Sequence, residues 1–119
     1  MAQKKEALKD RLARYREIQL TVTGRKSGKK ITRPVWFVVE NDTLYLLPVE
    51  GSDTQWYKNV LRDPHIQVAA RDATEDLQAA LITDAPAVQS VVERFREKYG
   101  AGDVKKYYSK FDVAVQAEL

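Results

Sequence analysis

The chain has 119 residues, 44% of them hydrophobic, which suits one domain with its own core and leaves no room for two. It contains no cysteine, which excludes disulfides, thiolate catalysis and cysteine-ligated metal centres and favours a reducing, cytoplasmic compartment. The net charge of +3 is uneven: residues 1–33 carry eleven Lys/Arg against three Asp/Glu (+8), and residues 34–119 carry nine against fourteen (−5). The N-terminal part is therefore expected to meet something anionic.

The first residues, "MAQKKEALKDRLARYREI", are charged throughout and contain no apolar h-region, so no signal peptide is expected. No apolar run approaches the length of a membrane span. In the same segment Leu8, Leu12 and Tyr15 recur at the spacing of one helical face, which predicts a helix over residues 3–17.

Alternating, β-branched segments follow this helix. "IQLTVTG" predicts a first strand, "ITRPVWFVVE" a second over residues 31–40, and "TLYLLPV" a third over residues 43–49. A basic turn joins the first two strands, and Asn41-Asp42 signals a turn between the next two. Pro34 and Pro48 are expected at strand ends, edges or bulges because proline cannot donate to a ladder. The spacing is that of an antiparallel meander.

The second half begins with a helix that has Ser52 or Asp53 as its expected N-cap and Pro64 as its stop. Two strands, "HIQVAAR" and "EDLQAALIT", come next. A longer helix, capped by Asp84, carries a buried stripe, and a short helix over residues 103–109 leads to a last strand, "FDVAVQAEL". The stripe comprises Val88, Val91, Val92, Phe95 and Tyr99.

These elements predict one α+β domain over residues 1–119, built as a six-stranded antiparallel β-barrel with peripheral helices. The strands are mostly consecutive, unlike the alternation of strands and helices that builds a parallel sheet. A barrel also removes exposed sheet edges.

Few residues offer acid–base or metal chemistry. His65 is the only histidine, and at the start of a strand it is expected to be structural. The carboxylates are scattered, without metal-ligand spacing, so no metal site is predicted. The sequence indicates no catalytic side chain of its own.

The basic turn is the clearest candidate site. "GRKSGKKITR" contains Arg25, Lys26, Lys29, Lys30 and Arg33, and two glycines bracket Ser27. It is not a Walker P-loop, because Gly24 and Gly28 stand one residue too close together and no helix follows. Glycines still let backbone N–H groups converge on an anion. Two interpretations stay open: an anion site and a solvated basic turn.

Two further clusters have alternative interpretations. Trp56 and Val60 are spaced to face the core, and Asn59 shares that side of its helix. A buried Asn amide needs partners, which a bound ring or phosphate could provide. Tyr99, Tyr107 and Tyr108, interleaved with lysines, suit either a nucleic-acid platform or a packed surface helix.

Taken together, residues 18–71 resemble the deazaflavin-dependent nitroreductase and quinone reductase family. The resemblance rests on "GRKSG", on Pro34-Val35 opening a strand, on "LYLL", and on Trp56-Tyr57-x-Asn59 followed by Asp63-Pro64. It implies a split β-barrel like that of flavin-binding pyridoxamine-phosphate oxidases.

The resemblance also implies an oxidoreductase that binds coenzyme F420 and transfers hydride to a quinone, nitro compound or similar small acceptor. By analogy, the cofactor phosphate and acidic tail are held by Arg25, Lys26, Ser27 and Gly28, with Lys29 and Arg33 beside them. Pro34, Val35 and Trp36 are expected to line the ring, and Trp56 and Asn59 to help close the pocket. Such enzymes supply position and electrostatics while the cofactor supplies the hydride. A homodimer is also expected.

The chain departs from the family pattern in the turn and after the third strand. Ile31 stands where many members have an arginine, which Lys30 or Arg33 would have to replace, and Glu50 stands where a Ser or Lys is common. Two alternative functions follow. One is an FMN- or other flavin-binding split barrel, and the other is a non-enzymatic binder of an anionic partner such as nucleic acid.

Overall fold

The structure, a computed structural model, describes residues 15–70 and 73–119. Most of the helix predicted over residues 3–17 lies outside the described residues. Its last three, residues 15–17, are described and are not helical.

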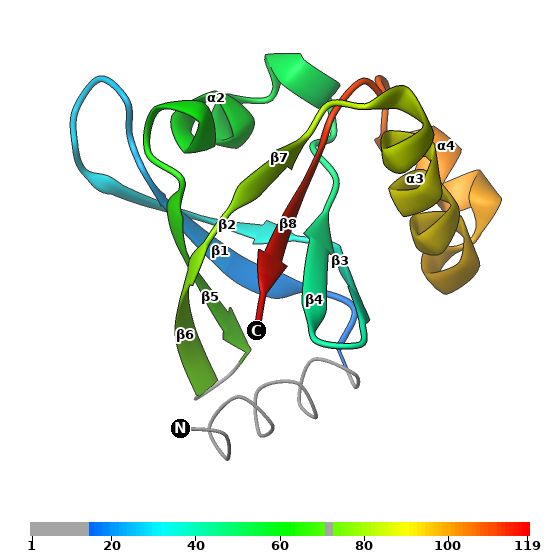
Figure 1. Cartoon of the computed structure of the whole chain (residues 1–119), viewed down its shortest axis with the longest axis horizontal. Helices are drawn as coiled ribbons and strands as arrows, with labels where there is room; N and C mark the ends of the chain where they lie inside the picture. Colours follow the sequence, from blue (N-terminus) through cyan, green and yellow to red (C-terminus); the bar gives the residue numbers. More distant parts are fainter. Residues whose placement is uncertain (1–14, 71–72) are drawn as a thin grey trace.

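The described residues form eight strands in two four-stranded antiparallel sheets, ordered β2-β1-β5-β6 and β3-β4-β8-β7. Figure 1 shows the two sheets wrapped around a shared interior. The strands are β1 (Ile18–Thr23), β2 (Lys30–Val35), β3 (Phe37–Glu40), β4 (Thr43–Leu46), β5 (His65–Ala70), β6 (Ala73–Gln78), β7 (Ala80–Ile82) and β8 (Ala114–Glu118).

The predicted count of six strands is wrong because two predicted strands each divide in two. The strand expected over residues 31–40 breaks at Trp36, and the one over residues 75–83 breaks at Ala79. At each break the chain leaves one sheet and enters the other, so β2 is followed by β3 and β6 by β7. Strands that switch sheets make the corners of such folds. Apolar residues continue without interruption across both breaks, in Val35-Trp36-Phe37 and in Ala79-Ala80-Leu81, so the sequence pattern alone does not reveal them.

Helices lie at one side and one end of the sheets (Figure 1). They are the 3₁₀ helix η1 (Gly51–Asp53), α2 (Gln55–Arg62), α3 (Ala85–Tyr99) and α4 (Ala101–Tyr107). The N-cap of α2 is Thr54, not Ser52 or Asp53, because those two residues belong to η1. Asp84 caps α3 as predicted, since its carboxylate accepts from the Ala87 N–H, and the predicted stripe of α3 is buried. The last helix starts two residues before the predicted 103.

The buried residues form two clusters on either side of the second sheet. One fills the space between the sheets and includes Leu20, Phe37, Val60 and Ile66. The other lies under α3 and α4 and includes Phe95. On α2, Val60 is buried as predicted, whereas its neighbour Leu61 is 54% exposed.

One ion pair joins α3 to the β3–β4 hairpin. Arg94 donates from Nε to Glu40 Oε2 at 2.7 Å and from Nη2 to Oε1 at 2.9 Å, and its guanidinium lies 5.0 Å from the ring centre of Tyr45. The bond from Arg94 holds the pKa of Glu40 below its usual value.

We therefore expect the Glu40–Arg94 pair to stabilise the fold above the unfolded-state pKa of Glu40, near 4.5. Its contribution falls away as the pH drops through the lower folded-state pKa. Urea unfolding of wild type and Glu40→Gln at pH 7 and pH 3 measures this. The stability gap between the two proteins should be smaller at pH 3, and a gap that does not change with pH would contradict the expectation.

Candidate functional site

A cavity of about 850 Å³ opens where the basic turn, the inner side of β2 and the start of α2 approach the end of α4. This volume is in the range of cofactor and ligand sites. The lining residues are Glu17, Gly24, Arg25, Lys26, Ser27, Ile31, Arg33, Pro34, Val35, Trp36, Leu47, Val49, Thr54, Gln55, Trp56, Asn59, Tyr107 and Tyr108.

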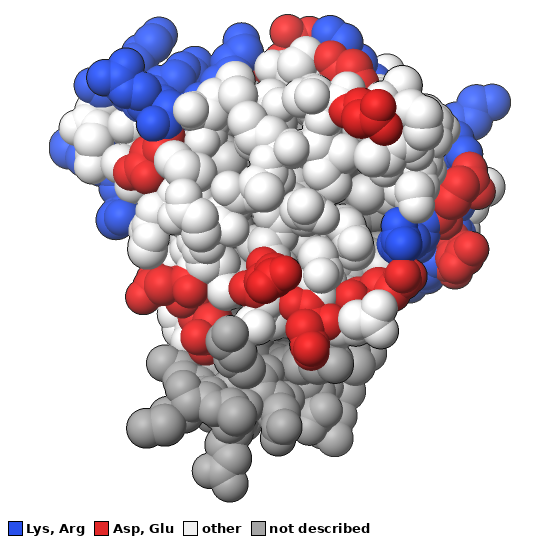
Figure 2. All heavy atoms as spheres, viewed as in Figure 1, with Lys and Arg blue, Asp and Glu red and all other residues white. Residues whose placement is uncertain are grey.

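Positive charge gathers at one corner of the molecule. Figure 2 shows Lys and Arg atoms concentrated over the β1–β2 turn, whereas acidic atoms are spread along the lower, right and upper edges of the same face. The turn closes through hydrogen bonds from Gly24 N to Lys29 O and from Gly28 N to Gly24 O. Gly28 has φ +72°, a left-handed conformation that favours glycine. The turn is therefore a formed structure that holds Lys26 and Ser27 at the cavity.

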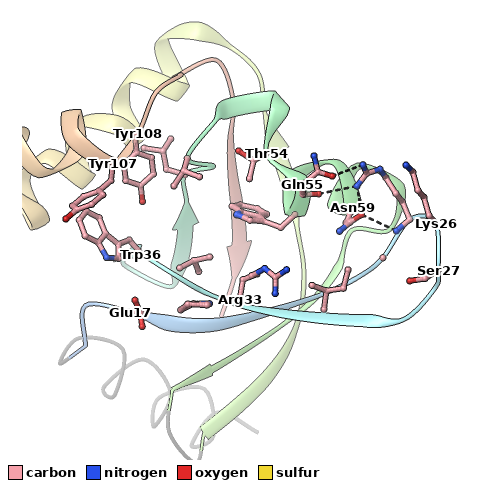
Figure 3. A pocket seen from close by; sticks show the side chains of 18 residues that line it. Glu17, Lys26, Ser27, Arg33, Trp36, Thr54, Gln55, Asn59, Tyr107 and Tyr108 are labelled. Atoms are coloured by element: carbon pink, nitrogen blue, oxygen red, sulfur yellow. Dashed lines mark hydrogen bonds between the residues drawn. The ribbon is translucent and has the colours of Figure 1, made fainter.

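Arg25 is engaged within the fold. Its backbone N–H and its Nη1 both donate to Asn59 Oδ1, at 3.1 and 2.8 Å, and its Nη2 donates to Gln55 Oε1 at 2.9 Å. These bonds tie the basic turn to α2 (Figure 3). The carbonyl oxygen of the buried Asn59 amide thus receives its hydrogen bonds from Arg25, without any ligand.

Alternation along β2 decides which cations face the cavity. Ile31, Arg33 and Val35 are two residues apart, share one side of the strand, and all line the cavity. Lys30 points to the other side, where its Nζ donates to Thr23 Oγ1 at 3.1 Å. Only one hydrogen bond is described for the Arg33 side chain, from Nη1 to Thr32 O at 3.3 Å. The guanidinium of Arg33 is therefore available to a ligand.

The other end of the cavity is aromatic. The Trp36 ring lies 5.5 Å from Tyr107, edge to face, and 6.0 Å from Tyr108. Figure 3 shows these three residues at one end of the cavity, Lys26 and Ser27 at the other, and Arg33 between them. Burial raises the pKa of Tyr108, so its hydroxyl stays protonated at neutral pH. We call Arg25, Lys26 and Ser27 the basic end, and Trp36, Tyr107 and Tyr108 the aromatic end.

The structure brings the predicted cofactor-binding residues to this one cavity, except Gly28 and Lys29, which do not line it. Glu50, which would repel an anionic tail, does not line it either, although its neighbour Val49 does. The residues that sequence reasoning missed come from segments far from the turn: Glu17, Leu47, Thr54, Gln55, Tyr107 and Tyr108. The two tyrosines had been noted as a cluster, but no local pattern places them against Trp36.

Other chemistry is sparse in the described part of the chain. His65 lies outside the cavity, with its Nε2 3.5 Å from Asp76 Oδ1. Residues 15–70 and 73–119 contain no group of three or more His, Asp or Glu that could hold a metal ion. None of the described helices is long and apolar enough to cross a membrane. The cytoplasmic location stays a prediction.

Comparison with known proteins adds a family and a fold. The sequence model of the F420H(2)-dependent quinone reductases matches residues 1–117. No curated protein matches the chain. One similar solved structure, described as an F420-H2 dependent reductase, has 24% identity and a TM-score of 0.67, with 87% of this chain and 94% of that chain covered.

Two more solved structures have the same fold. One, described as a domain-swapped dimer, has 24% identity and a TM-score of 0.68, covering 87% of this chain and 80% of that one. The other is a protein of Listeria innocua assigned as a pyridoxamine 5′-phosphate oxidase, with 17% identity and a TM-score of 0.69, covering 95% and 90%. At these identities the likeness shows the fold alone: a split barrel of the pyridoxamine-phosphate-oxidase kind.

Proposed function

The chain belongs to the F420H(2)-dependent quinone reductase family, and on this premise we propose how its cavity serves the reaction. Membership makes the protein a deazaflavin-dependent oxidoreductase with coenzyme F420 as its cofactor. When bound, this cofactor supplies the hydride. We propose that the acceptor is a quinone or a similar small planar compound, and that it binds in the same cavity as the cofactor.

The donor set of the cavity fits a molecule with an anionic chain at one end and a flat ring at the other. Lys26 and Ser27 lie at one end, Arg33 lies midway, and the aromatic end is walled by Trp36 (Figure 3). Cationic and hydroxyl donors bind phosphate and carboxylate oxygens, and aromatic faces bind flat conjugated rings. This polarity along one cavity is the observation that carries the proposal.

We assign roles to individual residues on this basis. Arg33 and Lys26 bind the phosphate and the acidic tail, with the Ser27 hydroxyl as a further donor. Arg25 holds the turn in place through Asn59 and contributes charge rather than a direct contact. Pro34, Val35 and Trp36 line the ring, and Trp56 packs beside it from α2. Together these residues orient the ring and keep water from one of its faces.

A further prediction concerns assembly. The homodimer expected from the sequence remains part of our proposal. One similar solved structure is described as a domain-swapped dimer, which shows that a protein of this fold can form a dimer.

Titration of the purified protein with F420 and with FMN, each followed by fluorescence, tests the proposal. We expect F420 to bind at least about tenfold more tightly than FMN, a difference of about 1.4 kcal/mol. The phosphate is common to both ligands, so the ring and the acidic tail make the difference. Equal or tighter binding of FMN would favour the alternative of a flavin-binding barrel, and steeply salt-dependent binding of RNA or DNA alone would favour a nucleic-acid binder.

A further inference from the structure

Tyr99, the last residue of α3, is 5% exposed and does not line the cavity, yet its hydroxyl reaches the break between β2 and β3. Tyr99 Oη lies 3.0 Å from Phe37 N, 2.8 Å from Phe37 O and 2.7 Å from Arg16 O. Phe37 is the residue directly after the break, and Arg16 precedes β1. One hydroxyl therefore joins the end of α3 to the first residue of β3 and to the segment that precedes β1.

The donors and acceptors around this hydroxyl can be assigned. A phenol has one proton to donate and also accepts. The Phe37 N–H donates to the oxygen of Tyr99. The Tyr99 proton is shared between Arg16 O at 2.7 Å and Phe37 O at 2.8 Å, since Phe37 O, which also accepts from Lys98 Nζ at 2.8 Å, has two lone pairs. Burial raises the pKa of Tyr99 to about 12, so the hydroxyl keeps this proton in ordinary conditions.

The ring of Tyr99 contacts the other side of the break. It stacks on Trp36, with ring centres 4.2 Å apart and planes within 10°. Trp36 is the residue at the break, and its ring also meets Tyr107 and Tyr108 in the cavity wall and lies 5.8 Å from the Arg16 guanidinium. Tyr99 thus holds the backbone next to Trp36 with its hydroxyl and the indole of Trp36 with its ring.

Where the chain crosses from one sheet to the other, buried backbone groups that the ladders do not pair need other partners, and Tyr99 provides one for the Phe37 N–H. We propose that Tyr99 is a positioning residue, which fixes Trp36 and thereby the aromatic end against which the cofactor ring lies. This inference rests on the proposed function of the cavity. The basic end is built from a different segment, so a change at Tyr99 should alter the position of the cofactor ring more than the affinity for the cofactor.

The test compares Tyr99→Phe, which removes the hydroxyl and keeps the ring, with Tyr45→Phe, which removes a hydroxyl from the same packing cluster away from the cavity. The first arm uses the Trp56→Phe background, where Trp36 is the only tryptophan, and no cofactor. We expect Tyr99→Phe to shift the Trp36 emission to longer wavelength and to speed its quenching by acrylamide. Tyr45→Phe should leave both unchanged.

The second arm measures turnover of F420H2 with menadione and the Kd of F420. We expect Tyr99→Phe to lower kcat by about tenfold, with Kd altered by less than about threefold, since a misplacement of reacting groups by about 1 Å can cost about a hundredfold in rate and a smaller one costs less. Unchanged Trp36 emission, equal losses in kcat and affinity, or the same loss in Tyr45→Phe would overturn the proposal. If wild type binds no F420, the proposed function fails, and the first arm still decides whether Tyr99 positions Trp36.

Should Tyr99→Phe fail to fold, Lys98→Met is used in its place, because Lys98 is the second side chain that donates to Phe37 O. This substitution keeps much of the apolar stem and removes the hydrogen bond. A shift of Trp36 emission to longer wavelength supports the proposal that the bonds to the Phe37 backbone hold Trp36 in place. An unchanged emission overturns that proposal.

Discussion

Replacing Arg33 with glutamine weakens F420 binding by about tenfold or more, equivalent to at least about 1.4 kcal/mol. Arg33 faces the cavity from β2 between the basic and aromatic ends, and a charged hydrogen bond to a phosphate or carboxylate contributes about this much. Equilibrium titration of the variant with F420 at a fixed, low salt concentration measures the effect.

Lys30→Gln is the matched control, because it removes the same charge from the same strand on the side that faces away from the cavity. It should change the Kd of F420 by less than about threefold, as expected for an exposed charge that acts only through solvent. Equal weakening by both substitutions would show that net charge, rather than a contact from Arg33, controls binding. The double variant Ile31→Arg/Arg33→Gln should recover part of the lost affinity, since residues 31 and 33 share one side of β2.

Replacing Asn59 with leucine should destabilise the protein by about 2 kcal/mol, because the Arg25 N–H and guanidinium lose their acceptor at a buried position. F420 affinity should fall as well, since the basic turn is no longer tied to α2. Urea unfolding and F420 titration measure the two effects separately.

Asn59→Asp separates stability from binding. It keeps an acceptor for Arg25, so stability should stay within about 1 kcal/mol of wild type. Its added negative charge lies at the basic end and should weaken F420 binding. If the aspartate variant unfolds as easily as the leucine variant, the bond accepted from Arg25 is not what holds the turn.

Local sequence patterns predicted helices and strands well where the structure of a segment depends on its own residues. The first strand, the Asp84 cap and the buried stripe of α3 are confirmed, because each depends on periodicity or on a capping residue within a few positions. The family was also recognisable from the sequence, since several short motifs occurred in the right order. The family model over residues 1–117 confirms it.

The features that sequence reasoning missed depend on contacts between distant segments. The breaks at Trp36 and Ala79 follow from closing two sheets around one core, and the apolar residues that continue across them give no sign of them. Arg25 and Lys26 were both predicted to hold the cofactor phosphate and tail, but the side chain of Arg25 is bonded to Asn59, 34 positions away. The choice between Lys30 and Arg33 was open because it depends on which side of β2 faces the cavity.

The place of β2 in its sheet has a consequence for solubility. Among the described strands β2 lies at the edge of its sheet and pairs only with β1, and exposed edges invite pairing with the edge of another molecule. Natural proteins block such pairing with charge and proline, and β2 contains both in Lys30, Arg33 and Pro34. Arg33 and Pro34 would thus serve two separate purposes, the proposed binding of the cofactor and the prevention of aggregation. Neutral variants of Arg33 that lose the cofactor should also be less soluble at high concentration.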